Sequence, residues 1–159
     1  MKSIFTTLFI ICCLILFSSF SGDEQHCLEI KGTVLDTKGK KLDKVKVVMM
    51  EDGKEISSME TKCPFKLEVA RDHYYTMVIS KEGYLPAVII VDSKVPKSHP
   101  DCNFHFEFHY DMIPDNHSYN KDYVDFPAAI IEYVKSGDEF LISDKYNNHI
   151  KKMIGANTK

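Results

Sequence analysis

Three side chains of types that commonly bind metal ions alternate along the segment NFHFEFHYDM. His105, Glu107 and His109 occupy every second position, so in a β-strand they would share one face. Imidazole and carboxylate groups that converge from one face can bind a metal ion. However, same-face positions on a strand are about 6.5 to 7 Å apart, which separates the two histidines by about 13 Å. A shared ion would therefore require a ligand from another element.

The same region allows an enzymatic interpretation as the alternative. A small hydrolase would need His99, His105 and His109 to cluster in a pocket that perturbs a pKa. The sequence contains neither a Gly-x-Ser-x-Gly nucleophile elbow nor a glycine-rich phosphate loop. The segment HYYT, which begins at His73, also lacks the glutamate of a His-x-x-Glu zinc pair. The sequence therefore predicts no cofactor, and it favours a protein that is not an enzyme.

Three cysteines follow the N-terminal segment, and two of them could pair if the chain is exported to an oxidising compartment. Cys27, Cys63 and Cys102 are separated by 36 and 39 residues, which matches neither a zinc ribbon nor a Cys-x-x-Cys redox motif. Three pairings are possible, and the spacing does not choose among them. We expect a structural disulfide or buried thiols, with a reactive thiol at Cys63 as the alternative.

The first 21 residues are typical of a signal peptide. Lys2 supplies a positive start, residues 4–17 are almost wholly apolar, and Ser19 and Ser21 are the small residues that a cleavage site requires. Lipidation at a cysteine of the apolar run and an uncleaved membrane anchor are the alternatives. We therefore expect an exported protein, with the periplasm, the outer membrane and the cell exterior all left open.

Charge and length limit what the exported part could bind and how it could fold. Cleavage would remove one of the 20 basic residues and none of the 23 acidic residues, leaving 19 against 23 and a net charge of −4. This charge disfavours binding to nucleic acid or to an anionic membrane. No later segment is apolar for long enough to span a bilayer. The remaining length suits one compact domain, with or without an appendage.

Residues 22–92 carry the pattern of a β-sandwich. In LEIKGTVLD, alternate residues Leu28, Ile30, Gly32 and Val34 share one face, and the glycine leaves room for a close neighbour. Asp-Gly in EDGKE and Glu-Gly in SKEGY predict hairpin turns between β-branched segments. The predicted fold is mainly β, an antiparallel sandwich of about seven strands with a C-terminal hairpin and a short helix.

Residues 93–159 differ in composition and are predicted to form a C-terminal extension that packs on the sandwich. One amphipathic strand carries an aromatic stripe, which we interpret as core; its members are Phe104, Phe106, Phe108 and Tyr110. A polar loop follows, and then the segments AAIIEYV and FLIS predict a hairpin. Ser143 or Asp144 could cap a final helix in which Tyr146, Ile150, Met153 and Ile154 share one face.

The β-rich segment resembles the carboxypeptidase regulatory-like, transthyretin-like module of exported and envelope proteins of Gram-negative bacteria. The resemblance covers residues 28–92 and rests on Gly32, the turn at Gly39, the strand VKVVM and the turn KEGY. One departure is Cys63-Pro64, which stands where the module usually has a glycine. The resemblance implies a transthyretin-like (prealbumin-like) sandwich. It also implies a non-catalytic role in folding, positioning or binding. A transthyretin-like hydrolase would need a Tyr-Arg-Gly-Ser segment, which this sequence does not contain.

We therefore expect a module that binds or scaffolds another envelope protein or a glycan. The long polar loop from Asp111 to Phe126 is the predicted contact surface, because loops carried on a rigid scaffold often bind partners. The candidate contact residues within it are Tyr119, Tyr123, Asp125 and Phe126. An exposed sheet edge that accepts a partner strand is a second predicted mode of binding.

Overall fold

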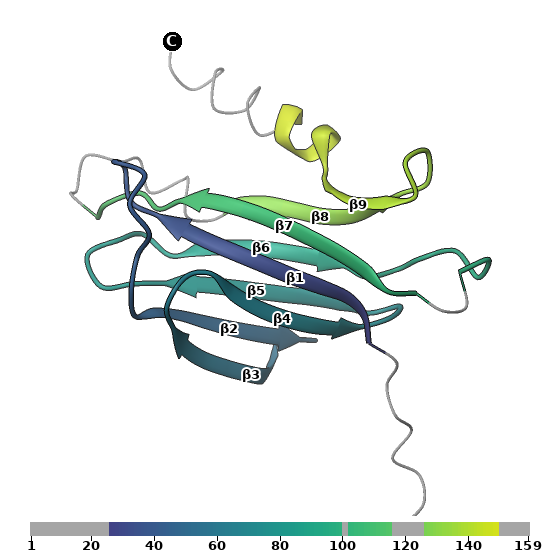
Figure 1. The fold of residues 1–159 in the computed structure, drawn as a ribbon, viewed down its shortest axis with the longest axis horizontal. Helices are drawn as coiled ribbons and strands as arrows, with labels where there is room; N and C mark the ends of the chain where they lie inside the picture. Colours follow the sequence, from purple (N-terminus) through teal and green to yellow (C-terminus); the bar gives the residue numbers. More distant parts are fainter. Residues whose placement is uncertain (1–25, 100–101, 116–125, 150–159) are drawn as a thin grey trace, which may run out of the picture.

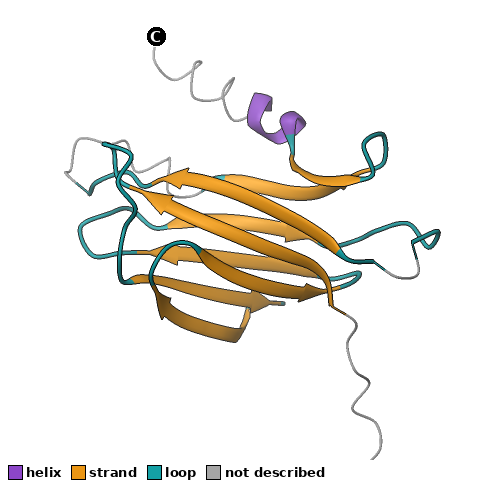
Figure 2. Ribbon diagram, in the orientation of Figure 1, coloured by secondary structure: helices purple, strands orange, loops and turns teal. Residues whose placement is uncertain are grey.

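A computed structural model describes residues 26–99, 102–115 and 126–149 of the chain. Two β-sheets pack face to face, and a short helix of residues 144–149 follows them (Figures 1 and 2). The strands are β1 (His26–Leu35), β2 (Val45–Glu51), β3 (Lys54–Thr61), β4 (Phe65–Ala70), β5 (Tyr74–Ser80), β6 (Ala87–Asp92), β7 (Phe104–Asp111), β8 (Ala129–Val134) and β9 (Glu139–Ile142). The prediction of a mainly β sandwich with one short C-terminal helix is confirmed.

The two sheets differ in size. The small sheet has the order β4-β1-β7, and the large sheet has the order β3-β2-β5-β6-β8-β9. Figure 1 shows β1, β4 and β7 crossing in front of β5 and β6. The segment expected as an extension thus contributes β7 to the small sheet and β8 and β9 to the large one, so both layers draw on both halves of the chain.

Two strand pairs are parallel, whereas the sequence predicted an antiparallel arrangement. β1 and β7 run in the same direction, as do β6 and β8, and the remaining pairs are antiparallel. After β6 the chain crosses to the small sheet for β7 and then returns to the large sheet as β8. Each crossing reverses its direction, so β8 ends parallel to β6. Such pairs join segments distant in sequence, and local turn signals do not reveal them.

Alternating burial explains why these segments form a sandwich. In β1, Leu28, Ile30 and Val34 are almost completely buried, as their spacing predicted. Gly32 lies on the same face, and a Cβ atom there would stand 2.2 Å from the Cζ of Phe65. The ring of Phe65 therefore fills the space that a side chain at position 32 would need, and the sequence-based expectation of a close neighbour at this glycine is confirmed.

The predicted turns are present, and a short segment separates the KEGY turn from the next strand. Asp52 and Gly53 both have positive φ, 47° and 74°, which suits the tight hairpin between β2 and β3. Gly83 has a φ of 80°, and β6 begins at Ala87. Pro86, which has no N–H to donate to a ladder, directly precedes the strand. Tyr84 instead makes an isolated β-bridge with Pro114.

One of the three possible cysteine pairings is formed. Cys27 and Cys102 form a disulfide with a Cα–Cα distance of 4.9 Å, and Cys63 is a free, partly buried thiol. The Sγ of Cys63 accepts a hydrogen bond from the N–H of Val34 at 3.3 Å. The peptide bond between Cys63 and Pro64 is cis, at the point where the sequence departs from the glycine of the resembled module.

The C-terminal hairpin and the start of the helix are confirmed. β8 and β9 pair antiparallel, and Ser143 lies directly before the helix. Its Oγ accepts a hydrogen bond from the N–H of Tyr146, and the hydroxyl of Tyr146 donates one to the carbonyl of Pro127. Residues 1–25, which include the predicted signal peptide, and residues 150–159 lie outside the described residues. Among those that are described, no helix is long and apolar enough to cross a membrane.

Candidate functional site

The alternating histidines lie on the solvent-facing side of the small sheet. His105, Glu107 and His109 are all exposed along β7, and Glu107 pairs with Lys31 of the neighbouring strand at 3.0 Å. In the described part of the chain, no group of three His, Cys, Asp or Glu side chains is arranged to hold a metal ion. The carboxylate that a metal would need is already paired with an ammonium group.

Opposite charges are paired between neighbouring strands on the outer face of the small sheet. Lys66 of β4 contacts both carboxylate oxygens of Glu29 in β1 at 3.0 Å, and His26 lies 3.8 Å from Glu68. These pairs join adjacent strands, as does the pair formed by Lys31 and Glu107. The face therefore has the ordinary character of a solvated sheet surface.

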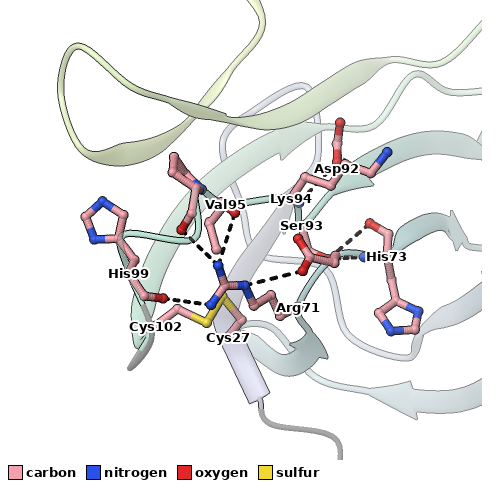
Figure 3. A network of polar contacts seen from close by, with 11 residues as sticks. Cys27, Arg71, His73, Asp92, Ser93, Lys94, Val95, His99 and Cys102 are labelled. Atoms are coloured by element: carbon pink, nitrogen blue, oxygen red, sulfur yellow. Dashed lines mark hydrogen bonds and ion pairs between the residues drawn. A yellow bond between two sulfur atoms is a disulfide. The ribbon is translucent and has the colours of Figure 1, made fainter.

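Arg71 organises the segment that leads into β7 (Figure 3). Its guanidinium group donates three hydrogen bonds to backbone carbonyls, from Nη1 to His99 at 2.8 Å and from Nη2 to Pro96 at 2.8 Å and Val95 at 3.2 Å. The carboxylate of Asp72 lies 3.4 Å from its Nε. One planar cation thus holds residues 95–99 beside the disulfide of Cys27 and Cys102 that Figure 3 also shows.

This fixed segment places His99 in a polar cluster with Tyr133 and Asp138. The hydroxyl of Tyr133 donates to Oδ1 of Asp138 at 2.7 Å and lies 3.2 Å from Nε2 of His99. The same imidazole nitrogen lies 3.3 Å from Oδ1 of Asp138. The hydrogen bond to Asp138, together with burial and the nearby negative charge, raises the pKa of the Tyr133 hydroxyl.

Aromatic rings support the same cluster. His99 packs edge-on against Phe104 with ring centroids 5.9 Å apart, and Tyr133 packs against Phe104 and Phe140. Phe104 has its side chain on the opposite face of β7 from His105, because successive residues of a strand alternate. His99 is therefore separated from His105 and His109 by the strand itself, and the three imidazoles do not share one pocket.

A second polar cluster contains the residue types of a hydrolytic triad but not its geometry. The imidazole Nδ1 of His73 pairs with the carboxylate of Glu51, and Ser93 lies nearby. The fully buried hydroxyl of Ser93 accepts from the backbone N–H of His73 and donates to its backbone carbonyl, both at 3.0 Å. No bond joins the hydroxyl to the imidazole, so His73 does not activate Ser93. The serine ties β5 to the end of β6.

Only part of the predicted binding loop lies within the described residues. Tyr119, Tyr123 and Asp125 lie outside the described residues. Phe126 is described and is 43% exposed, which places one large apolar side chain of this set at the surface.

The sheet edge formed by β3 is the other predicted contact. Of its eight residues, Ile56 is 53% exposed, and none is buried. A register shift in the pairing with β2 leaves Ile56 without a partner residue, so the strand bulges there and is regular only from Ser57 to Thr61. In sequence, the signal of an edge strand is that EISSMET has mostly polar residues on both faces.

Sequence reasoning missed Tyr133 and Asp138 as partners of His99. Asp138 lies in the turn between β8 and β9 with a φ of 53°, and Tyr133 lies in β8, five residues before Asp138. The hairpin predicted from AAIIEYV and FLIS carries no information about a histidine 34 residues before Tyr133.

Comparison with known proteins finds only weak structural similarity, to solved structures. No protein-family model matches the chain, and no curated protein matches it either. Among solved structures, catechol 1,2-dioxygenase from an Acinetobacter species with bound mercury is similar at a TM-score of 0.42 and 12% identity, over 64% of this chain and 59% of that one. A single-residue variant of catechol 1,2-dioxygenase from Acinetobacter radioresistens gives 0.41 and 11%, over 65% and 57%. The chain spans less than two thirds of the length of either enzyme.

Proposed function

We propose that this protein is a non-catalytic, exported β-sandwich module that binds another protein of the cell envelope through the free edge of β3. The observation that carries the proposal is the exposure of this strand. All eight of its residues face solvent at least in part, at one end of a six-stranded sheet. The proposed export rests on the signal-like pattern of residues 1–21.

Strand addition suits the regular part of this edge. Backbone N–H and C=O groups of an edge strand that point away from the sheet can pair with an extended segment of a partner. The bulge at Ile56 limits such pairing to residues 57–61. A bulged edge resists pairing along its full length, which guards against uncontrolled aggregation while leaving a short stretch for one partner strand.

Exposed side chains on this stretch and in the bulge beside it would give the contact its specificity. Ile56 of the bulge is 53% exposed, and Glu55 and Glu60 add negative charge, whereas Met59 packs against the core. A partner segment with basic residues spaced to meet these two carboxylates fits the edge best. A glycan would gain little here, because β3 contains no aromatic side chain on which a sugar ring could stack.

The test uses two proline variants that differ only in which backbone group they remove. Neighbouring residues of an edge strand point their N–H groups in opposite directions, so one of Ser57→Pro and Ser58→Pro removes a bond to β2 and the other removes an outward N–H. We expect one variant to lower the melting temperature and the other to leave it nearly unchanged. The thermally unaffected variant is then the probe for binding.

Binding is measured by recovery of a defined partner band from an envelope fraction with the purified full chain as bait. The proposal expects that the thermally unaffected proline variant loses most of the recovery. A second variant, in which the loop from Asp111 to Phe126 is replaced by a Gly-Ser linker, separates the edge from the loop. Full recovery with the proline variant and loss with the linker variant would assign binding to the loop and overturn the role of β3.

A further inference from the structure

The outer face of the large sheet is apolar at its centre. Successive residues of a strand point to opposite faces, so the neighbours of buried residues point away from the core. The buried residues are Val47 and Met49 of β2, Met77 and Ile79 of β5, and Ile89 of β6. The outward apolar residues beside them are Val48, Met50, Val78, Val88 and Ile90. Ile130 of β8 continues this set, since it pairs with Ile90. All six outward side chains are partly exposed.

The strand register arranges these side chains in two continuous rows. One row crosses β2, β5 and β6 through the aligned residues Val48, Val78 and Val88. The next row crosses four strands through Met50, Thr76, Ile90 and Ile130. Thr76 is the one polar member of the two rows, and no charged residue interrupts them. We call this surface the apolar face.

The other sheet of the same molecule provides the comparison. Its outer face carries charge pairs that join neighbouring strands, Glu29 with Lys66 and Lys31 with Glu107. Sheets with one face in water normally show such alternation of inward apolar and outward polar residues. The large sheet departs from that pattern on its central strands, and contiguous exposed apolar surface of this kind marks interaction sites.

Two of the most exposed apolar side chains border the apolar face. The row beyond Ile90 runs through Tyr74, Asp92, Glu132 and Leu141, which are aligned across β5, β6, β8 and β9. Tyr74 is 53% exposed and Leu141 is 40% exposed. Between them, the carboxylates of Asp92 and Glu132 occupy directly opposite positions, where like charges repel each other.

Opposite charge stands at the other end of the face. Lys46 is the outward residue of β2 beyond the valine row, beside Ser80 and across from Glu60. A line from Lys46 to Asp92 therefore crosses both apolar rows, from Lys46 and the aligned Glu60 at one end to Asp92 and Glu132 at the other, where the ammonium of Lys94 also lies, 4.0 Å from the centre of the Tyr74 ring. With charges of both signs at its two ends, this surface lets Lys46 meet the two carboxylates of a second copy after a rotation of 180°.

We infer that a second copy of this chain covers the apolar face, with the two large sheets stacked about a two-fold axis through the centre of the face. The rotation places Lys46 of each copy over Asp92 and Glu132 of the other and buries the two apolar rows against each other. This arrangement repeats between copies the sheet-on-sheet packing that already forms the core. It uses the outer face of the large sheet and leaves the backbone edge of β3 unpaired, so it does not rest on the proposed function.

The dimensions indicate a dimer of modest affinity. Strands about 4.8 Å apart and same-face residues about 6.8 Å apart give the seven positions of the two apolar rows roughly 230 Å² of flat sheet. Stable complexes bury about 800 Å² per partner, so the charged rows at both ends must join the contact. We therefore expect association in the micromolar range that depends on the charge pairs.

The experiment measures oligomeric state by sedimentation velocity of the purified full chain between about 1 and 500 µM, a span that brackets micromolar affinity. The inference expects a monomer that converts to a dimer with rising concentration. Ile90→Lys places a charge at the centre of the face and should raise the dissociation constant at least about tenfold, as burying an unpaired charge is costly. His105→Lys places the same charge on the outer face of the other sheet and should change nothing.

A charge exchange tests the orientation of the two copies. Lys46→Glu and Asp92→Lys should each weaken the dimer, because each creates like charges across the two-fold axis, and the double variant should recover most of the affinity. This recovery also rules out misfolding as the cause of the loss. A chain that stays monomeric up to 500 µM, an Ile90→Lys variant that dimerises normally, or a double variant no better than the singles would each overturn the inference.

Discussion

The ring of Phe65 fills the space beside Gly32 that a side chain at position 32 would occupy. A Cβ at position 32 would lie within 2.8 Å of three ring atoms of Phe65, with the shortest distance 2.2 Å. The two residues are aligned across β1 and β4, so the contact also fixes how these strands pair. The ring of Phe108, from β7, packs edge-on against Phe65 at 6.2 Å and holds it in place.

Gly32→Ala should therefore destabilise the fold by about 1 to 3 kcal/mol, since overpacking of a filled core forces side chains and backbone to shift. Denaturant unfolding followed by fluorescence or circular dichroism measures the change. Phe65→Leu makes room, so the double variant should lose less than the sum of the two single losses. Gly137→Ala is the matched control, because the atoms nearest to it belong to the flexible side chain of Glu139. Strict additivity would show that the ring does not occupy this space.

The disulfide gives a second prediction. Cys27 and Cys102 connect the start of β1 to the segment before β7, across a sequence separation of 75 residues. Replacing both by alanine should cost about 2 to 5 kcal/mol and lower the melting temperature, as is typical when a native disulfide is removed. Addition of a reductant to the unchanged protein should have a similar effect. Cys63→Ser keeps a hydrogen-bond acceptor for Val34 and should leave the disulfide intact.

Peptide mapping without reduction provides the direct check on this pairing. We expect one linked peptide pair that contains Cys27 and Cys102 and an alkylated peptide that contains Cys63. A linked pair that includes Cys63 would contradict the structure.

Local patterns predicted those parts of the fold that local spacing determines. The alternating burial from Leu28 to Gly32 in β1, the close neighbour of Gly32 and the Asp52-Gly53 hairpin all depend on local spacing. The aromatic stripe of β7 also follows its predicted role, since Phe108 is buried and its companions pack against the core. Each of these features is fixed by backbone periodicity or by the φ that a turn requires.

Contacts between segments that are distant in sequence could not be predicted from local patterns. Cys27 pairs with Cys102 rather than Cys63 because of which strands are neighbours in the fold. The strands β1 and β7 pair in parallel, and no tight turn in the sequence predicts that pairing. The cluster of His99, Tyr133 and Asp138 likewise requires Arg71 to fix the preceding segment. A run such as AVIIVD, apolar on both faces, was the one sequence signal for the apolar face.

Arg71 supplies the third prediction. Its guanidinium binds three carbonyl oxygens in fixed directions, which a lysine ammonium cannot reproduce from one nitrogen. Arg71→Lys should therefore lower the stability by about 1 to 3 kcal/mol, within the range for hydrogen bonds to charged groups. Hydrogen exchange of residues 95–99 should also accelerate. Lys97→Ala changes an exposed cation in the same segment and should leave both measurements near their original values. Unchanged exchange in the Arg71 variant would mean that other contacts hold this segment.

The fourth prediction concerns alkaline pH and Tyr110. Burial raises the pKa of the Tyr110 hydroxyl, and the charge of Asp111 acts in the same direction. Because the folded-state pKa is above the unfolded-state value of about 10, the neutral hydroxyl contributes its full stabilisation below pH 10. That contribution is lost as the pH rises through the folded-state pKa, since the unfolded chain ionises first.

Tyr110→Phe removes this ionisable group while keeping the ring that packs against the core. The melting temperatures of the variant and the unchanged protein should therefore run in parallel from pH 7 to about 9 and diverge above pH 10, where the variant falls less steeply. Thermal unfolding followed by circular dichroism across this range measures both slopes.

Tyr133 has its pKa raised mainly by the hydrogen bond to Asp138, so Tyr133→Phe should flatten the alkaline slope in the same direction. Equal slopes above pH 10 in all three proteins would show that neither hydroxyl is held in its neutral form by the fold.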